Sequence, residues 1–157
     1  MANRIKIEHA RIGFRNFSGA EAKYNPPGRR NFCVFLDSDF AEELAEQGWN
    51  IKWLRPKNDN DEPQAYMQVS VSFAKFPPNI FLVTRKQKTR LDESMLNMLD
   101  WAELENVDLI INPRPWDDGG TTRIKAYLRT MYATIVEDEF AEKYDDIPDS
   151  ALSSMME

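Results

Sequence analysis

The sequence predicts a mainly β protein with two short helices, whose strands close into a small barrel. Three observations support this fold class. Segments such as residues 64–73 alternate cleanly, with Met67, Val69, Val71 and Phe73 on one face. Only two segments combine helical spacing with a capping residue. Long strands near both ends of the chain frame the shorter ones, which is an order found in small barrels.

The first half of the chain is expected to hold three strands and one helix. The apolar phase of the first strand changes near Ile12 and Phe14, so Gly13 is a candidate for a bend or bulge. Ser38 or Asp39 is the expected helix cap. The predicted elements are strands at 4–17, 30–37 and 50–56, a mobile loop rich in Pro, Gly and polar residues at 18–30, and a helix at 38–48.

The second half is expected to add four strands and the second helix. Asp92 is the expected helix cap, with Leu96 and Leu99 facing inward and Met95 and Leu104 as further candidates. Paired glycines after two aspartates favour a hairpin turn. The predicted elements are strands at 64–73, 80–84, 107–116 and 122–138, a helix at 91–106, and a turn at 117–121.

This order of elements matches an OB-fold, a small Greek-key barrel. The barrel would carry an extra helix after its second strand and an extra strand or hairpin around residues 64–84. A generic α+β domain is the alternative fold.

The charge of the chain is unevenly distributed. The 157 residues suit one domain and carry a net charge of −6. Residues 137–157 hold eight acids and one lysine, so this segment carries −7 and the rest of the chain +1. We therefore expect a barrel domain over residues 1–137 and a flexible acidic tail over residues 138–157. The overall charge does not exclude a nucleic-acid ligand for the near-neutral body.

Catalytic and cofactor sites are not expected. His9 is the only histidine and Cys33 the only cysteine, so a zinc site or an internal disulfide cannot be assembled. No phosphate-cradling glycine loop is present, so we predict no cofactor, no metal and no enzyme activity. The N-terminus lacks a signal-peptide core, and no apolar run approaches the ~20 residues of a membrane span. A cytoplasmic location, away from membranes, is expected.

The last predicted strand carries the strongest functional signal. Arg123, Lys125, Tyr127 and Arg129 share one face, while Ile124, Ala126, Leu128 and Thr130 share the other. Cations neutralise phosphates, and an aromatic ring stacks on an unpaired base. A solvated strand face with Tyr127 covering its neighbours is an equally weighted alternative.

Other segments mix cations and rings at positions that an OB-fold uses for ligands, namely the strand 2–3 face and the loops joining strands 1–2 and 4–5. Trp53 could equally be buried, and Trp49 and Trp101 are expected to pack at helix ends. Phe32 and Phe35 fall on opposite faces of one strand, so at least one should be core. The predicted nucleic-acid-binding residues are Arg15, Lys23, Tyr24, Arg29, Arg30, Lys52, Trp53, Arg55, Arg114, Trp116, Arg123, Lys125, Tyr127 and Arg129.

Several blocks of the sequence also resemble a known family. They are "YNPPGRRNFCVFLD", "GWNIKWLRP", "LDWAELENVDLIINPRPW" and "IKAYLRTMYATI". Together they are similar to the single-stranded DNA-binding proteins of tailed bacteriophages, an OB-fold family. The resemblance implies a non-enzymatic protein that coats and protects single-stranded DNA in replication or recombination.

The acidic tail resembles the C-terminal ends with which bacterial single-stranded DNA-binding proteins recruit replication enzymes. "DDIP" fits that pattern, but the chain continues through "DSALSSMME" without a terminal aromatic residue. Replication or recombination proteins are therefore expected partners through the tail, and the oligomeric state is left open between monomer and dimer. Two rival functions are a protein-interaction module on the same barrel and a metal-dependent nuclease using Asp117, Asp118 or residues 137–139.

Overall fold

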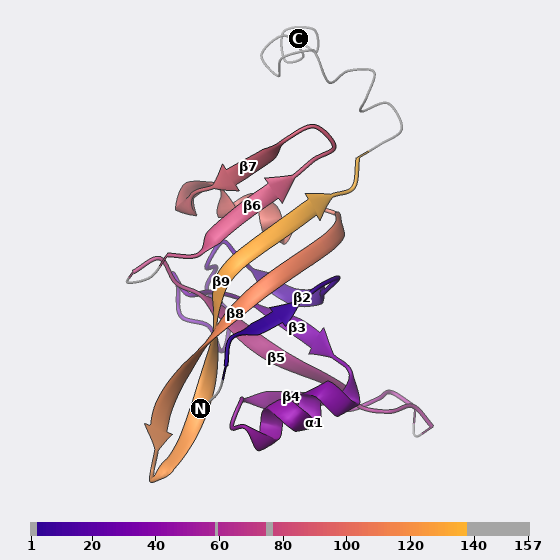
Figure 1. Ribbon diagram of the computed structural model, residues 1–157, viewed down its shortest axis with the longest axis vertical. Coiled ribbons are helices and arrows are strands. Elements are labelled where there is room, and N and C mark those ends of the chain that lie inside the picture. Colours follow the sequence, from indigo (N-terminus) through magenta and orange to yellow (C-terminus); the bar gives the residue numbers. More distant parts are fainter. Residues whose placement is uncertain (1–2, 59, 75–76, 138–157) are drawn as a thin grey trace, which may run out of the picture.

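The computed structural model describes residues 3–58, 60–74 and 77–137. These residues form nine strands and two short helices (Figure 1). The strands are β1 (Ile5–Ile7), β2 (Arg11–Asn16), β3 (Arg30–Leu36), β4 (Ile51–Leu54), β5 (Gln64–Val71), β6 (Asn79–Val83), β7 (Lys88–Leu91), β8 (Leu104–Asp118) and β9 (Thr121–Ile135). The helices are α1 (Ser38–Glu46) and a 3₁₀-helix, η1 (Glu93–Asp100). No helix in the described ranges is long and apolar enough to cross a membrane.

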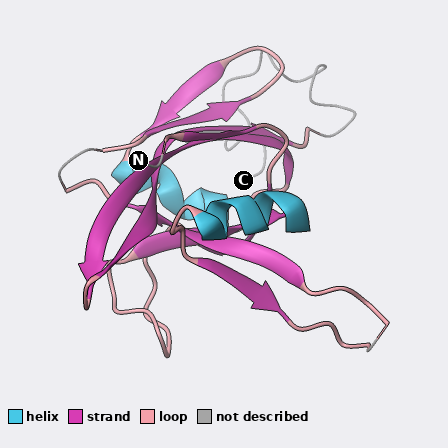
Figure 2. Ribbon diagram, turned by 60° about the horizontal axis from the view of Figure 1, so that its bottom comes forward, coloured by secondary structure: helices cyan, strands magenta, loops and turns pink. Residues whose placement is uncertain are grey.

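One sheet curls around the core. Its strand order is β1-β8-β9-β5-β3-β2, so it begins and ends with neighbouring pieces of the N-terminal segment. β5 and β9 run parallel, whereas the other pairs along this path are antiparallel. Figure 2 shows the strands curling around the interior, with α1 across one end. The mainly β composition is as predicted, but the sheet curls without closing, whereas the sequence predicted a closed barrel.

The predicted first strand is divided into β1 and β2 rather than continuous. At the break, His9 adopts φ 54°, and its backbone N–H donates to Asp108 Oδ1 (3.0 Å). A bulge follows between Gly13 and Asn16, where Phe14 adopts φ 47°. A Cβ on residue 13 would come within 2.7 Å of the Phe35 ring, which explains a glycine beside the bulge. The bend predicted at Gly13 is thus a bulge, and the strained residue is the one after it.

Both helices are present but differ from the prediction in detail. α1 is capped by Asp37, whose side chain accepts from the backbone N–H of Phe40 (2.8 Å), and not by Ser38 or Asp39. The second helix was predicted to continue to residue 106. It is instead a short 3₁₀-helix, η1, which ends at Asp100, and the strand β8 begins at Leu104. Asp92 caps it and Leu96 and Leu99 are buried, as predicted.

A clamp joins the end of η1 to the end of β2. The Asp100 carboxylate accepts from the backbone N–H groups of Phe17 (2.6 Å) and Ser18 (3.2 Å). In return, Arg15 donates to the carbonyls of Leu99 (3.1 Å) and Ala102 (2.7 Å). These bonds satisfy carbonyls that the short helix leaves unpaired.

The extra helix predicted after the second strand is α1, but the extra strand or hairpin predicted around residues 64–84 differs in the structure. Residues 64–71 form β5, which pairs with β3, β4 and β9 and is therefore a central strand. The added hairpin is β6–β7, and β6 lies parallel to the second half of β9. β4 is a short addition that pairs with β5.

In most strands the buried residues are those that the alternating pattern of the sequence placed on the inward face. Phe32 is fully buried, as are Met67 and Val69. Trp49 is buried as expected, but Trp101 is 85% exposed and Met95 is also exposed, contrary to the prediction. In β9, Ile124, Ala126 and Leu128 are buried, whereas Thr130 is only partly buried. A register shift opposite Ile110 and Ile111 moves the inward positions to Met131 and Ala133.

Candidate nucleic-acid interface

Strand register places polar side chains in a row on the outside of the barrel. Asn31 in β3 is opposite Ser70 in β5, Ser70 is opposite Tyr127 in β9, and Tyr127 is opposite Asn112 in β8. Residues opposite each other in a sheet point to the same side. Their strand neighbours Phe32, Val69 and Ala126 are buried, so the row faces outward. We call this side of β3, β5 and residues 123–127 of β9 the outer face.

A cleft of about 570 Å³ lies over this row. Its floor includes Gln68 and Ser70 from β5, and its walls combine the loop before β3 with β9. Tyr24, which is 88% exposed, stands at one side, and the Lys23 ammonium lies 5.3 Å from the centre of its ring. The predicted residues that line the cleft are Tyr24, Arg29, Arg30, Lys125 and Tyr127.

One acidic side chain of the described residues also lines the cleft. Glu93, at the start of η1, accepts from Arg30 Nη1 at 2.8 Å. Arg30 is mostly buried, and its Nε lacks a hydrogen-bond partner. The guanidinium is therefore held at the cleft by its ion pair with Glu93, and its buried Nε is not open to a ligand.

The β8–β9 hairpin continues the row with alternating cations and rings. Arg114 is opposite Lys125, and Trp116 is opposite Arg123. The Arg114 guanidinium lies 5.0 Å from the centre of the Tyr127 ring. Lys125 Nζ lies 5.6 Å from the centre of the Trp116 ring. Positive charges thus sit beside both rings, which suits binding of bases and phosphates together.

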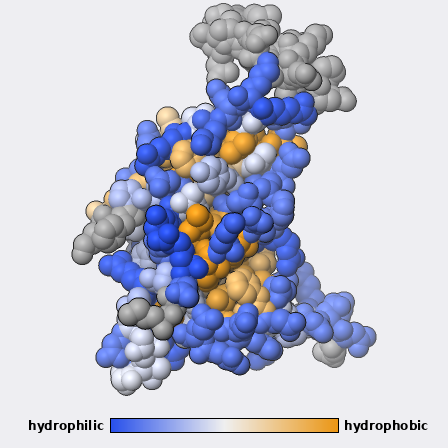
Figure 3. Space-filling model, viewed as in Figure 1, coloured by the Kyte–Doolittle hydropathy of each residue, from blue (hydrophilic) through white to orange (hydrophobic). Residues whose placement is uncertain are grey.

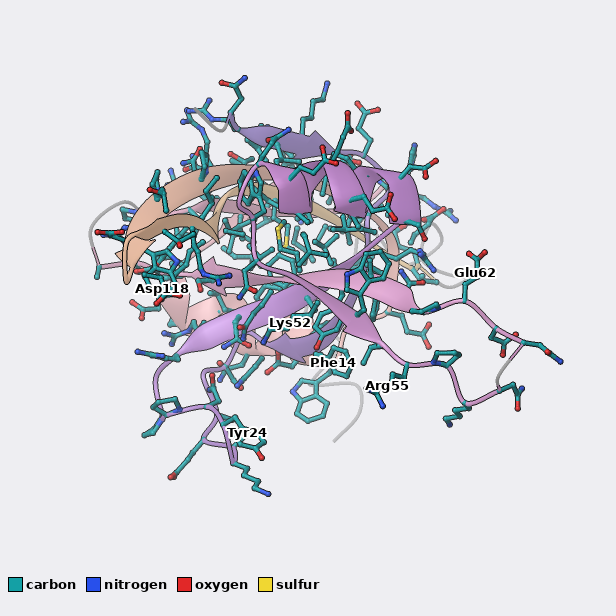
Figure 4. The ribbon with its side chains drawn as sticks, turned by 90° about the horizontal axis from the view of Figure 1, so that it is seen from below. Phe14, Tyr24, Lys52, Arg55, Glu62 and Asp118 are labelled. Atoms are coloured by element: carbon teal, nitrogen blue, oxygen red, sulfur yellow. The ribbon has the colours of Figure 1, made fainter. Side chains whose placement is uncertain are left out.

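A second aromatic group, which sequence reasoning missed, lies further along the outer face. Phe35 is opposite Tyr66, and the exposed Phe14 ring lies 6.1 Å and 5.9 Å from their respective ring centres. Lys52 is opposite Tyr66. Figure 4 shows Phe14 and Lys52 on the same side of the barrel as Tyr24, away from α1.

The left-handed backbone of Phe14 holds its ring outward. A non-glycine residue at positive φ is strained, and such strain concentrates at functional sites. The alternation of residues 64–73 placed Tyr66 and Gln68 on one face, which was the available signal for this group. Phe32 and Phe35 were placed on opposite faces of β3, but the apolar pattern of the strand did not show that Phe35 is the outward one.

Some predicted residues lie outside the cleft. Arg15 is engaged in the clamp with η1. Trp53 does not line the cleft; it is opposite the buried Ala65 and yet is 42% exposed, so it is not the core residue that the sequence left open. Arg55 follows β4 and lies on the same side as Lys52 in Figure 4, whereas Arg129 is exposed at the register shift of β9.

The Cys33 thiol lies on the outer face, opposite Gln68, and is buried. Burial raises the pKa of this thiol, and the nearby Lys52 charge opposes the rise in pKa only in part. The thiol is therefore protonated near neutral pH and does not serve as a nucleophile there.

Two of the carboxylates proposed for a nuclease are already in ion pairs. Asp118 forms an ion pair with Arg123 (2.9 Å), and Glu137 pairs with Arg85 (3.3 Å). Within residues 3–58, 60–74 and 77–137, no three His, Cys, Asp or Glu side chains are grouped to hold a metal ion. Residues 138 and 139, and the whole predicted tail, lie outside the described residues.

Comparisons with known proteins show the family and the fold of the chain. A family described as "Putative phage ssDNA-binding domain" matches residues 1–155. No curated protein sequence matches significantly. The structure is similar to the single-stranded DNA-binding protein of bacteriophage Enc34 in complex with ssDNA (TM-score 0.55, 11% identity, covering 87% of this chain and 89% of that one). Another structure of the Enc34 protein gives a TM-score of 0.53 at 12% identity, covering 96% and 89%. These likenesses show the fold.

Proposed function

We propose that this chain, which belongs to the phage ssDNA-binding domain family, coats single-stranded DNA through the outer face and the cleft above it. The observation that carries the proposal is the position of Tyr127. Its ring lines the cleft, with Arg114 beside it. Arg29, Arg30 and Lys125 line the same cleft. A base stacked on Tyr127 would therefore have cations within reach of its phosphates.

The proposed binding is independent of base sequence. Stacking tolerates any base, because every base has a π-face, and phosphate contacts carry no sequence information. The rings of Phe14, Phe35 and Tyr66 would extend base stacking along the outer face. Lys52, which is opposite Tyr66, would contact a phosphate there. Such a protein protects exposed strands in replication or recombination and needs no catalytic group. We place it in the host cytoplasm.

The tail has a separate proposed role. Residues 138–157 would form an acidic segment beyond the barrel domain, and we propose that it docks replication or recombination proteins. The support for this role is the charge pattern of the sequence.

A protein-interaction function has one observation in its favour. Met95, Met98 and Trp101 recur every three residues along η1 and its end, and all three are exposed. A 3₁₀-helix has three residues per turn, so these side chains align on one edge. A module that served only to bind proteins would not bind an oligonucleotide, which separates the two functions.

Titration with oligo-dT tests the proposed function. Tryptophan fluorescence should fall as DNA binds, because Trp116 is exposed beside Lys125 in the hairpin. A duplex of equal length should bind far more weakly, since its bases are already stacked. The logarithm of the binding constant should fall with the logarithm of salt concentration, by roughly 0.7 for each phosphate neutralised. Equal affinity for duplex and single strand would contradict the stacking surface.

Replacing Glu93 with glutamine should strengthen binding about two- to fivefold, a change below roughly 1 kcal/mol, because the Glu93 side chain is exposed and solvent screens its charge. An incoming phosphate must compete with the Glu93 carboxylate for Arg30 and is repelled by it. Oligo-dT titration of the variant measures the gain. Glu105→Gln, which removes an exposed carboxylate outside this cleft, is the matched control and should leave affinity unchanged. Weaker binding by Glu93→Gln would instead show that Glu93 holds Arg30 in a productive position.

A further inference from the structure

A further group of rings and cations lies where the β6–β7 hairpin pairs with β9. The rings of Phe81 and Tyr132 stack, with centres 4.9 Å apart and planes 16° apart. Lys88 Nζ lies 4.9 Å from the centre of Phe81 and 5.7 Å from that of Tyr132. Arg90 is opposite Phe81 in register and is exposed. Among the described residues, no carboxylate pairs with Lys88 or Arg90.

The surroundings of this group favour an anionic ligand with flat, apolar parts. Figure 3 shows hydrophobic side chains over β6 with hydrophilic ones around them. Residues 85–90 contain four cations and no acid. Arg85 is paired with Glu137, whereas Lys88 contacts both rings and Arg90 is opposite Phe81.

This group is continuous with the proposed cleft along β9. Tyr127 is beside β5, and Tyr132 is beside β6, which replaces β5 along the same edge of β9. Both tyrosines point outward, because Leu128 and Met131 are the inward residues between them. Arg129 is exposed at the register shift between the two tyrosines. Five residues of strand separate the rings by about 16 Å.

We propose that the β6–β7 hairpin is a second contact for single-stranded DNA, which continues from the cleft along β9 past Arg129 to Phe81 and Tyr132. The inference rests on the proposed function of the cleft. Lys88 and Arg90 bind phosphates there, and the ring pair carries a base. A base would reach the rings where Lys88 now covers them, and the displaced ammonium would move to a phosphate. This contact accounts for Arg129, which the cleft alone does not use.

The test is a length series. OB-folds occupy about 4–16 nucleotides, so oligo-dT from ~4 to ~16 nucleotides samples the cleft alone and then the longer path. Lys88→Ala/Arg90→Ala should bind the shortest oligonucleotides as well as the wild type does. It should bind the longest ones more weakly. The slope of the logarithm of the binding constant against the logarithm of salt concentration should also be smaller in magnitude by about 1.4, which corresponds to two lost phosphate contacts at ~0.7 each. Lys6→Ala, an exposed cation on β1, is the control and should leave affinity unchanged at every length.

The outcomes separate the two proposals. If the wild type fails to bind any oligonucleotide, the cleft itself is wrong. If the wild type binds but the double variant matches it at every length, the second contact is overturned. The second contact is also overturned if the double variant weakens binding equally at all lengths, because its cations would then act on the cleft. Thermal melting of each variant confirms that it is folded, and Lys88→Glu/Arg90→Glu, which should enlarge the same length-dependent loss, repeats the test with reversed charge.

Discussion

Replacing Leu128 with alanine should lower the free energy of unfolding by about 2–5 kcal/mol. Leu128 is 3% exposed in the middle of β9, and its cross-strand partner Ile111 is fully buried. Truncation would remove apolar contacts and leave a cavity that the paired strands β8 and β9 cannot easily close. For a protein of this size, the melting temperature should fall by roughly 4–20 °C.

Thermal or denaturant unfolding measures this loss. The adjacent Arg129→Ala variant is the matched stability control, since Arg129 is exposed and its truncation should change stability by less than about 0.5 kcal/mol. The folded fraction of Leu128→Ala should still bind oligo-dT, because its side chain points away from the outer face. An unchanged melting temperature would contradict the burial of this position.

Replacing Tyr127 with alanine should produce the opposite result, a loss of single-strand affinity of about 1–3 kcal/mol with little loss of stability. That loss corresponds to roughly 5–150-fold in the dissociation constant. Tyr127 lines the cleft and is only partly buried, so its ring is available to a base. Fluorescence titration with oligo-dT measures the effect.

Tyr127→Phe is the matched control for the ring. It removes the hydroxyl but keeps the aromatic face, so it should bind nearly as well as the wild type. If Tyr127→Ala instead lowers the melting temperature strongly while its folded fraction binds normally, the ring is a packing residue and the stacking role is wrong.

The secondary structure was largely predictable because period and capping are local properties. Alternation in residues 64–71 and 123–128 assigned the inward residues correctly, including Met67 and Leu128, whereas Phe73 lies beyond β5 and is only partly buried. Asp92 was a correct cap, and Gly119 and Gly120 take the positive φ values that the predicted turn requires. The prediction of inward residues failed where contacts between residues far apart in sequence set the strand register. Thr130 is not an inward residue because a register shift against β8 changes the phase, which no pattern within β9 shows.

The candidate site was predictable in its ingredients but not in its assembly. Tyr127 and Lys125 stood out by alternation, and the loop before β3 stood out by its mixture of rings and cations. Arg15 looked like another such cation, yet it binds two carbonyls at the end of η1, 84 and 87 residues away in sequence. The outward Phe14, Phe35 and Tyr66 come from three strands and meet through register.

By itself, the sequence determined a mainly β chain with two short helices and a strand, residues 123–128, with one apolar and one cationic-aromatic face. These features follow from side-chain period and from chemistry along the chain, which act over a few residues. Only the tertiary structure decided that β5 is a central strand, that β6 replaces it along β9, and that Arg30 pairs with Glu93 in the cleft. These outcomes depend on strand pairing between residues far apart in sequence. The order in which strands meet is set by burial of the common core, and a local pattern does not encode it.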